Sequence, residues 1–286
     1  MKVIYVNKSN RHTFLAENEP TVIALGFFDG VHLGHQQVIK KAKKLADEKK
    51  LQLVCMSFFP HPKEVLNRDN QKIQYLMPMR AKQRVLKKLG VKKFYIIQFD
   101  NEFASLTPEQ FVQNYLIDFG VKYAVAGFDF TYGQFGKGNM DRIEEDSNHW
   151  IKGIKVEKVE HDGEKISSTL IRQLISSGKM DIVHRYLGQH YQIQGKIHSN
   201  KNSVEVVANP YYLLPPPGVY EVRVSNGDNI ANQVVLVTQE APRIIFSNRN
   251  NSLLMDQQDI YIEWIKRLSA GRFTIVEEHA SLFKEA

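Results

Sequence analysis

The first half of the chain alternates short hydrophobic runs with amphipathic segments of helical periodicity. The hydrophobic runs have the length of β-strands and occupy residues 21–28, 51–59, 91–99 and 121–130. The amphipathic segments occupy residues 35–50, 79–90 and 107–120, and the last opens with Thr107 as a helix cap and Pro108 at the first helical position. Apolar strands that alternate with helices predict a parallel sheet covered on both faces, so we predict a Rossmann-like α/β domain.

The pattern changes after Leu187 and Gly188. Short segments of alternating polar and apolar residues follow, separated by Gly, Asn and Pro: YQIQGKI, VEVVAN, GVYEVRVSN, NQVVLVTQ and RIIFSN. They predict a small antiparallel β-barrel or sandwich, and residues 256–268 predict a terminal helix packed on it. The predicted domains are therefore residues 1–187 and 188–286.

Composition narrows the class of protein. A chain of 286 residues with 43% hydrophobic and 24% charged residues is long enough for two hydrophobic cores. Its net charge of +7 comes from lysines scattered over helical segments, so we expect no nucleic-acid partner. No apolar run has the length of a signal peptide or a membrane helix, so we expect a cytoplasmic protein without a membrane partner. The single cysteine, Cys55, lies in the run LVCMSFF and is expected to be a buried strand residue.

The first candidate site is the loop GFFDGVHLGHQQ, which lies between a predicted strand and a predicted helix. Its glycines let the backbone turn sharply and approach an anion, and His32 and His35 stand beside the helix N-terminus. Helix amides and imidazoles that converge on one point suit nucleotide phosphates. An ordinary polar helix start is one alternative, and a zinc site that uses both histidines is another, although it lacks a third ligand nearby.

The loop AGFDFTYGQFGKGNMD follows the fourth predicted strand and combines Gly127, Asp129, Gly133, Gly136 and Gly138 with three aromatic side chains. Phe128, Phe130 and Tyr132 could wrap a flat ring while the backbone at Gly127 and Asp129 contacts phosphates. A flexible surface loop is the alternative. The position of the loop at the carboxyl end of a strand favours a binding function.

Two further segments carry candidate chemistry. ISSTLIRQLISSG predicts a helix capped by Ser167 or Ser168, with Arg172 one turn in, so that hydroxyls, amides and a guanidinium could face one anion. Capping alone would explain the serines, and a surface ion pair would explain Arg172. The segment SFFPHPKEVL offers a ring-binding lip formed by Phe58, Phe59 and His61.

Together GFFDGVHLGH, FFPHPKEVL, AGFDFTYG, ISSTLIR and RYLGQHYQIQGKI resemble, in order and spacing, the bacterial bifunctional riboflavin kinase/FAD synthetase family over residues 1–198. The resemblance implies an N-terminal nucleotidylyltransferase module that transfers AMP from MgATP to FMN and releases pyrophosphate. It also implies a C-terminal barrel that phosphorylates riboflavin. ATP and FMN would be the substrates, and Mg²⁺ the cofactor.

The resemblance also assigns roles to the matching positions. The catalytic residues would be His32, His35 and Arg172. The nucleotide-binding residues would be Gly26, Phe28, Asp29, Gly30, Gly34, Gly127, Asp129, Ser168 and Thr169, with Asp129 also a contact for Mg²⁺. The flavin-binding residues would be Phe59, His61 and Phe128.

The second half departs from the family. Kinase modules of the family carry a Gly-rich stretch ending in Pro-Thr-Ala-Asn, just before a segment leading to Gly-Val-Tyr. Only Ala208-Asn209 and Gly218-Val219-Tyr220 match this pattern here, and the Gly-rich turn and the Thr that would hold Mg²⁺ and phosphate have no counterpart. Glu240 is a weak candidate for a catalytic acid. We therefore expect an FAD synthetase that has lost riboflavin kinase activity. Two alternatives remain: adenylyl transfer to another phosphorylated acceptor, and a non-catalytic regulatory protein that binds flavin or nucleotide. The sequence does not indicate an oligomeric state.

Overall fold

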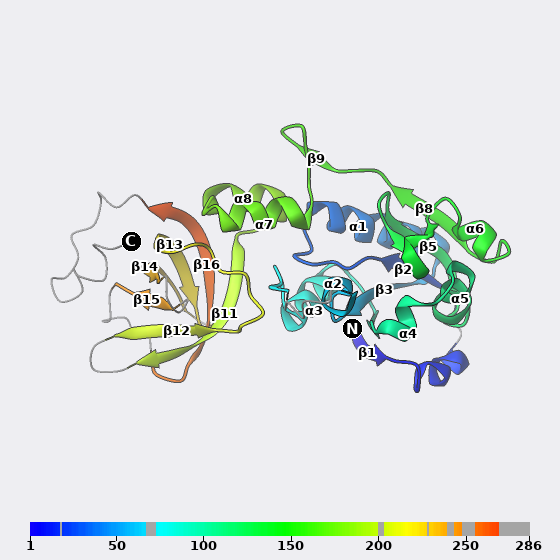
Figure 1. Cartoon of the computed structure of the whole chain (residues 1–286), viewed down its shortest axis with the longest axis horizontal. Helices are drawn as coiled ribbons and strands as arrows, with labels where there is room; N and C mark the ends of the chain where they lie inside the picture. The colour runs from blue at the N-terminus through cyan, green and yellow to red at the C-terminus, as the bar shows by residue number, and fades with distance from the viewer. Residues whose placement is uncertain are drawn as a thin grey trace. The chain divides into compact units, whose positions relative to one another are not determined.

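The computed structural model describes residues 1–17, 19–66, 73–199, 203–227, 229–238, 243–247 and 255–268. They form two compact units (Figure 1). The first unit comprises residues 1–73 and 79–166, and the second comprises residues 74–78 and 167–286. The helices just before residue 188 thus group with the barrel, and the boundary drawn there between two domains stays a prediction.

A six-stranded sheet forms the centre of the first unit, and every neighbouring pair of strands in it is parallel. The spatial order is β1 (Lys2–Val6), β4 (Lys93–Gln98), β3 (Gln52–Phe59), β2 (Thr21–Leu25), β5 (Val121–Gly127) and β8 (Lys152–Val156). The chain runs outward from β2 to β3 and β4 and then returns to the other side of β2 as β5. Ligands of open parallel sheets bind at such a switch point, beyond the carboxyl ends of the strands.

Helices cover this sheet as the periodicity predicted (Figure 1). They include α1 (Leu33–Lys49), α3 (Met79–Lys88) and α5 (Pro108–Val112), which continues as the π-helical turn η2 (Gln113–Ile117). The predicted cap at Thr107 is confirmed, since its hydroxyl accepts a hydrogen bond from the backbone N–H of Gln110. The shorter elements are η1 (Arg11–Glu17), α2 (Pro62–Leu66), α4 (Asn101–Ala104), β6 (Thr131–Tyr132), η3 (Gln134–Gly136), β7 (Gly138–Asn139), α6 (Ile143–Asp146), β9 (Glu160–His161) and β10 (Glu164–Lys165).

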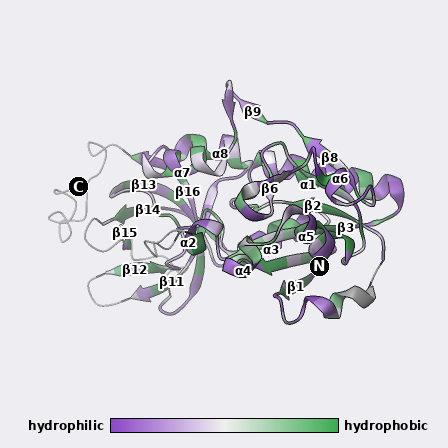
Figure 2. Ribbon diagram, turned by 45° about the vertical axis from the view of Figure 1, so that its right-hand side comes forward, coloured by the Kyte–Doolittle hydropathy of each residue, from purple (hydrophilic) through white to green (hydrophobic). Residues whose placement is uncertain are grey.

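The buried core of the first unit combines the central strands with α1 and with the continuous helix formed by α5 and η2. All five residues of β2 are buried, as are Val38, Ile39, Ala42 and Ala46 on α1. Hydrophobic residues gather along the central strands, whereas the β9–β10 hairpin is hydrophilic (Figure 2). The predicted burial of Cys55 on β3 is confirmed, and this burial raises the pKa of its thiol.

The second unit holds the helices α7 (Ser168–Ser176) and α8 (Met180–Leu187) and a closed six-stranded barrel. The barrel is antiparallel throughout, in the order β11 (Tyr191–Ser199), β12 (Val204–Ala208), β15 (Ile244–Phe246), β14 (Ile230–Val237), β13 (Gly218–Ser225) and β16 (Asp259–Leu268). The predicted barrel is therefore confirmed. Its largest fully buried side chains are Tyr191, Tyr220 and Trp264.

The terminal helix predicted for residues 256–268 is wrong, because Asp259–Leu268 is the strand β16. Ile260, Ile262 and Trp264 are buried, and the residues between them are less so, which is the period of two typical of a strand. β16 pairs with β11 on one side and β13 on the other, and so closes the barrel. Backbone pairing to two neighbours decided the conformation of a segment whose side chains alone fitted a helix.

Candidate active site

A tight loop of residues 26–32 connects β2 to α1 at the switch point of the sheet; we call it the histidine loop. Phe28, Gly30 and Val31 have φ angles of 53°, 77° and 42°. Such angles strain the two residues that carry a Cβ, so the surrounding structure must hold the loop in place. The ring of Phe28 is fully buried, and a Cβ at Gly26 would lie 2.9 Å from it. The close packing of Gly26 against the buried Phe28 ring therefore constrains the conformation of the loop.

The histidine loop places His32 and His35 at the N-terminus of α1, as predicted. His32 caps the helix, because its Nδ1 accepts a hydrogen bond from the backbone N–H of His35 at 3.2 Å. The two imidazole rings stack with centroids 3.6 Å apart and planes 15° apart. A Cβ at Gly34 would lie 3.2 Å from the His32 ring, so glycine suits the stack. We call His32 and His35 the histidine pair.

Both members of the histidine pair are neutral near pH 7. Burial lowers the pKa of His32 to about 4, and burial lowers the pKa of His35 well below its ordinary value. Because Nδ1 of His32 accepts a hydrogen bond, its proton lies on Nε2, which is then a donor. Nδ1 of His35 is buried and has no hydrogen-bond partner within the described part of the chain. A ligand that supplies one would complete the pair.

The lowered pKa of His32 predicts a loss of stability in mild acid. The unfolded chain binds a proton at this site below pH 6.5, while the folded chain resists it down to about pH 4. Stability therefore falls as the pH drops through this window, by about 3 kcal/mol from this group at full protonation. In urea titrations from pH 7 to 4, His32→Asn, which keeps a capping side chain, should flatten this slope. An unchanged slope would contradict the assignment, and His12→Asn at an exposed position is the control.

Asp129 follows β5 and lies beside the histidine pair. Leu25 of β2 pairs with Ala126 of β5, so the loops after both strands start at the same level. The charge of Asp129 acts on His32, where it raises the pKa against the larger effect of burial. Its carboxylate also accepts a hydrogen bond from Lys165 at 2.6 Å, and the Lys165 ammonium lies 4.5 Å from the ring centroid of Phe128. The structure thus brings the two predicted loops together.

The predicted ring-binding lip is partly accessible. Phe59 is 39% exposed at the end of β3, whereas Phe58 is 9% exposed and packs in the core. His61 packs edge-on against Phe27, with ring centroids 4.3 Å apart, and its Nδ1 accepts a hydrogen bond from the backbone N–H of Lys63. Aromatic surface is therefore present at the carboxyl ends of β2 and β3.

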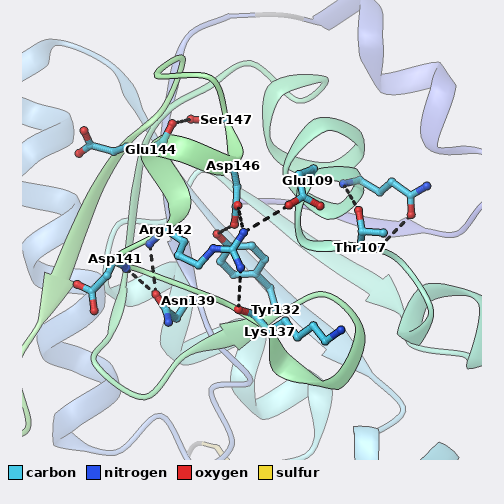
Figure 3. Close-up of polar contacts among 11 residues, drawn as sticks. Thr107, Glu109, Tyr132, Lys137, Asn139, Asp141, Arg142, Glu144, Asp146 and Ser147 are labelled. Atoms are coloured by element: carbon cyan, nitrogen blue, oxygen red, sulfur yellow. Dashed lines mark hydrogen bonds and ion pairs between the residues drawn. The ribbon is translucent and has the colours of Figure 1, made fainter.

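A network of polar contacts centred on the buried carboxylate of Asp146 anchors the loop that follows Asp129 (Figure 3). The hydroxyl of Tyr132 donates to one carboxylate oxygen of Asp146 at 2.6 Å, and Arg142 donates to the other at 2.7 Å. Arg142 also reaches Glu109 on α5 and the backbone carbonyl of Lys137. Asp146 is buried, and its partners Tyr132 and Arg142 lie on this loop or just after it. The network fixes the loop against α5 and α6.

Replacing Tyr132 by phenylalanine should destabilise the first unit by about 1–3 kcal/mol, because the buried carboxylate of Asp146 would lose a donor. Burial and the bond to Asp146 both raise the pKa of Tyr132, so the hydroxyl stays a donor over the working pH range. Chemical denaturation measures the effect. Tyr5→Phe is the matched control, since Tyr5 is 61% exposed. Equal stability of the two variants would show that the network contributes nothing.

The predicted anion site of ISSTLIR belongs to the second unit. Ser167 caps α7 by accepting a hydrogen bond from the backbone N–H of Leu170 at 3.1 Å, which settles the choice between the two serines. Ser168 and Thr169 open the helix, and Arg172 is half-buried one turn later. Their roles in ligand binding stay predictions.

Two lysines of the site, Lys165 and Lys82, carry no motif that could be recognised in the sequence. Lys165 was not singled out, although it directly precedes the Ile-Ser-Ser-Thr motif; the β9–β10 hairpin delivers it to Asp129. Lys82 on α3 is 1% exposed and lies under the histidine loop, where its ammonium donates to the carbonyl of Phe27 at 2.8 Å. Asp29, a predicted nucleotide contact, is itself 1% exposed, and its charge acts on Lys82. In the sequence Lys82 is one of many lysines on an amphipathic helix, so no pattern distinguished it.

The described residues contain no group of three or more His, Cys, Asp or Glu side chains arranged to hold a metal ion. Glu240 lies outside the described residues. None of the helices that the structure describes is long and apolar enough to cross a membrane.

The family model and the curated relatives that match this chain agree on one family. A family model described as FAD synthetase matches residues 15–170. The bifunctional riboflavin kinase/FMN adenylyltransferase of Bacillus subtilis is 37% identical over 95% of this chain and 91% of its own. A Listeria monocytogenes protein named FAD synthetase is 30% identical over 75% of this chain and 91% of its own. A crystal structure described as a macrolide-efflux protein from Streptococcus pneumoniae superposes with a TM-score of 0.84 and 27% identity, covering 100% of this chain and 97% of the other.

Proposed function

The chain belongs to the FAD synthetase family, and on that premise we propose that it transfers AMP from MgATP to FMN and releases pyrophosphate. The observation that carries the proposal is the histidine pair at the N-terminus of α1, with the buried Nδ1 of His35 lacking a protein partner in the described chain. Helix amides and neutral imidazole donors at a switch point suit the phosphates of a nucleotide.

The proposed reaction is in-line attack by a phosphate oxygen of FMN on the α-phosphorus of ATP. The new P–O bond forms as the bond from the α-phosphorus to the bridging oxygen breaks, and pyrophosphate leaves with the bonding electrons. An ionised phosphate needs little general-base help, so the protein contributes positioning and stabilisation of charge. The Nε2–H of His32, His35 and the first amides of α1 would donate to the phosphates, with Ser168, Thr169 and Arg172 as further contacts.

Mg²⁺ fits the residues present, because Asp129 supplies a carboxylate beside the histidine pair. Mg²⁺ commonly binds through one or two carboxylates together with substrate phosphates. Asp129 would hold it, at the level of the histidine pair, and the ion would neutralise charge on the phosphates. The ammonium of Lys165, which Asp129 binds in the free protein, is then an additional phosphate contact.

A flat acceptor is supported by the aromatic groups at the carboxyl ends of the strands. Phe59 is 39% exposed and Phe128 is 38% exposed, a large exposure for side chains of this type. His61 and Phe27 pack edge-on nearby in the chain. Aromatic rings that are both exposed and held in place offer stacking surfaces for the ring system of a flavin.

We further propose that the barrel does not phosphorylate riboflavin. The sequence between His198 and Asn209 contains no glycine and no threonine, so it has neither the Gly-rich turn nor the threonine of the family pattern. Among the described residues of the barrel, the buried side chains with polar groups include Gln233, at 9% exposure, and the large aromatic residues Tyr191, Tyr220 and Trp264. Hydrophobic side chains fill the interior, which suits a structural role.

Product analysis tests both proposals. Purified protein is incubated with MgATP and either FMN or riboflavin, and FMN, FAD, ADP and pyrophosphate are resolved chromatographically. We expect FAD and pyrophosphate when FMN is supplied. We expect neither FMN nor ADP when riboflavin is supplied. FMN or ADP formed from riboflavin would overturn the proposed loss of kinase activity. Absence of FAD with FMN as the acceptor would overturn the proposed synthetase.

A further inference from the structure

Lys82 is a buried cation that the proposed chemistry does not use. It lies on α3, is 1% exposed, and its ammonium donates to the carbonyl oxygen of Phe27 at 2.8 Å. The hydroxyl of Ser57 on β3 donates to the same carbonyl at 2.7 Å, and the ammonium lies 3.4 Å from that hydroxyl oxygen. The strand β3, the helix α3 and the histidine loop therefore meet at the carbonyl of Phe27.

Two opposing effects act on the pKa of Lys82. Burial lowers the pKa of Lys82 to about 8, and the charge of Asp29 opposes that effect. The ammonium also lies 4.8 Å from the ring centroid of Phe27, a distance at which a cation is attracted to the ring face. On the side of α1, Lys82 lowers the pKa of His35. The charged and titratable groups facing Lys82 are thus Asp29 from the loop and His35 from α1.

The histidine loop needs such a tether. Phe28 and Val31 have positive φ angles, which side-chain-bearing residues keep only where their neighbours enforce them. The carbonyl of Phe27 directly precedes this strained stretch, so a fixed donor there sets the direction in which the loop leaves β2. The far end of the same loop is His32, the cap of α1.

We propose that Lys82 is a positioning residue of the histidine pair: by holding the carbonyl of Phe27 and facing Asp29, its ammonium fixes the loop that carries His32 and His35. Lys82 is buried beneath the loop and acts through it, without touching the substrate. The kinetic part of the test rests on the proposed FAD synthesis, and the structural part does not.

The kinetic test compares Lys82→Met, Lys82→Arg and the exposed control Lys87→Met on the same helix. At pH 7, Lys82→Met should lower kcat about ten- to a hundredfold, because misplaced donors lose contact with the transition state. Lys87→Met should match the parent protein. A kcat of Lys82→Met within twofold of the parent value would overturn the proposal.

The pH profile separates a charge requirement from a packing requirement. If the protonated ammonium is needed, the parent kcat is full below pH 8 and falls above it, as Lys82 loses its proton. Lys82→Arg should regain at least part of the activity lost in Lys82→Met and should keep it at pH 9, because a guanidinium stays charged. An unchanged alkaline fall in Lys82→Arg, or no recovery relative to Lys82→Met, would overturn the proposal.

A measurement on the protein alone keeps the two proposals separable. Two-dimensional NMR spectra of the histidine rings report the stacked pair without any substrate. In Lys82→Met the His32 and His35 signals should move, while in Lys87→Met they should stay. Should the parent protein make no FAD, the proposed function fails, and this spectrum still decides the role of Lys82: unmoved ring signals in Lys82→Met would refute it.

Discussion

Replacing His35 by alanine is expected to lower kcat for FAD formation at least about a hundredfold at saturating ATP and FMN, because removing one donor to developing charge has an effect of this size. His35 stands in the first turn of α1, stacked on His32, with a buried Nδ1 that no described residue satisfies. Its contact with the phosphates should strengthen as pyrophosphate departs. Steady-state assays of pyrophosphate release measure the change.

Two control experiments show whether a loss of kcat in His35→Ala is specific to the removed imidazole. His12→Ala removes an exposed imidazole and should leave kcat unchanged. Thermal unfolding of His35→Ala shows whether the loss follows from a disturbed fold, since the ring also packs edge-on against Phe28 with centroids 5.4 Å apart. A folded His35→Ala protein with the parent kcat would exclude His35 from the reaction and leave the pair as an ordinary helix start.

Replacing Arg172 by alanine is expected to lower kcat by a similar factor, at least about a hundredfold, if its guanidinium binds the phosphates that leave. Ser167 already accounts for the capping of α7, so capping does not explain the arginine that follows one turn later. The same pyrophosphate assay applies, with the KM for ATP determined in parallel.

The matched control is Arg185→Ala, which removes an exposed arginine from the neighbouring helix α8. It should change neither kcat nor KM. If Arg172→Ala keeps the kcat and KM of the parent protein, Arg172 is a structural surface residue and not a phosphate contact. Loss of stability without loss of turnover would lead to the same conclusion.

The periodicity of hydrophobic residues predicted the central strands and their helices because burial on both faces leaves an unbroken apolar run. It missed β1 and β8, the two edge strands, whose sequences KVIYV and KGIKV are only five residues long and each begin with a lysine. It also mistook β16 for a helix, since Ile260, Ile262 and Trp264 become a strand face only when two partner strands are in place. These partner strands, β11 and β13, lie far from β16 in the sequence, so the segment alone does not reveal that it is a strand.

The candidate site likewise contains features with a local sequence pattern and features that depend on residues distant in the sequence. Glycine and histidine spacing located the histidine loop, because a strand-to-helix turn leaves a local trace in the sequence. The contacts of Lys82 with Phe27 and of Lys165 with Asp129 span 55 and 36 residues, so the local sequence around each lysine does not show its partner. The bond from Tyr132 to Asp146 likewise depends on how the loop folds back.

Cys55 gives the chain a practical property. It is the single cysteine, it is fully buried on β3, and burial raises the pKa of its thiol, so the nucleophilic thiolate is scarce and inaccessible. Toward maleimide reagents the folded protein therefore behaves as though it had no cysteine. One cysteine introduced at exposed Glu164, on the hairpin that carries Lys165, would accept a fluorophore at a single defined position and report nucleotide binding in real time.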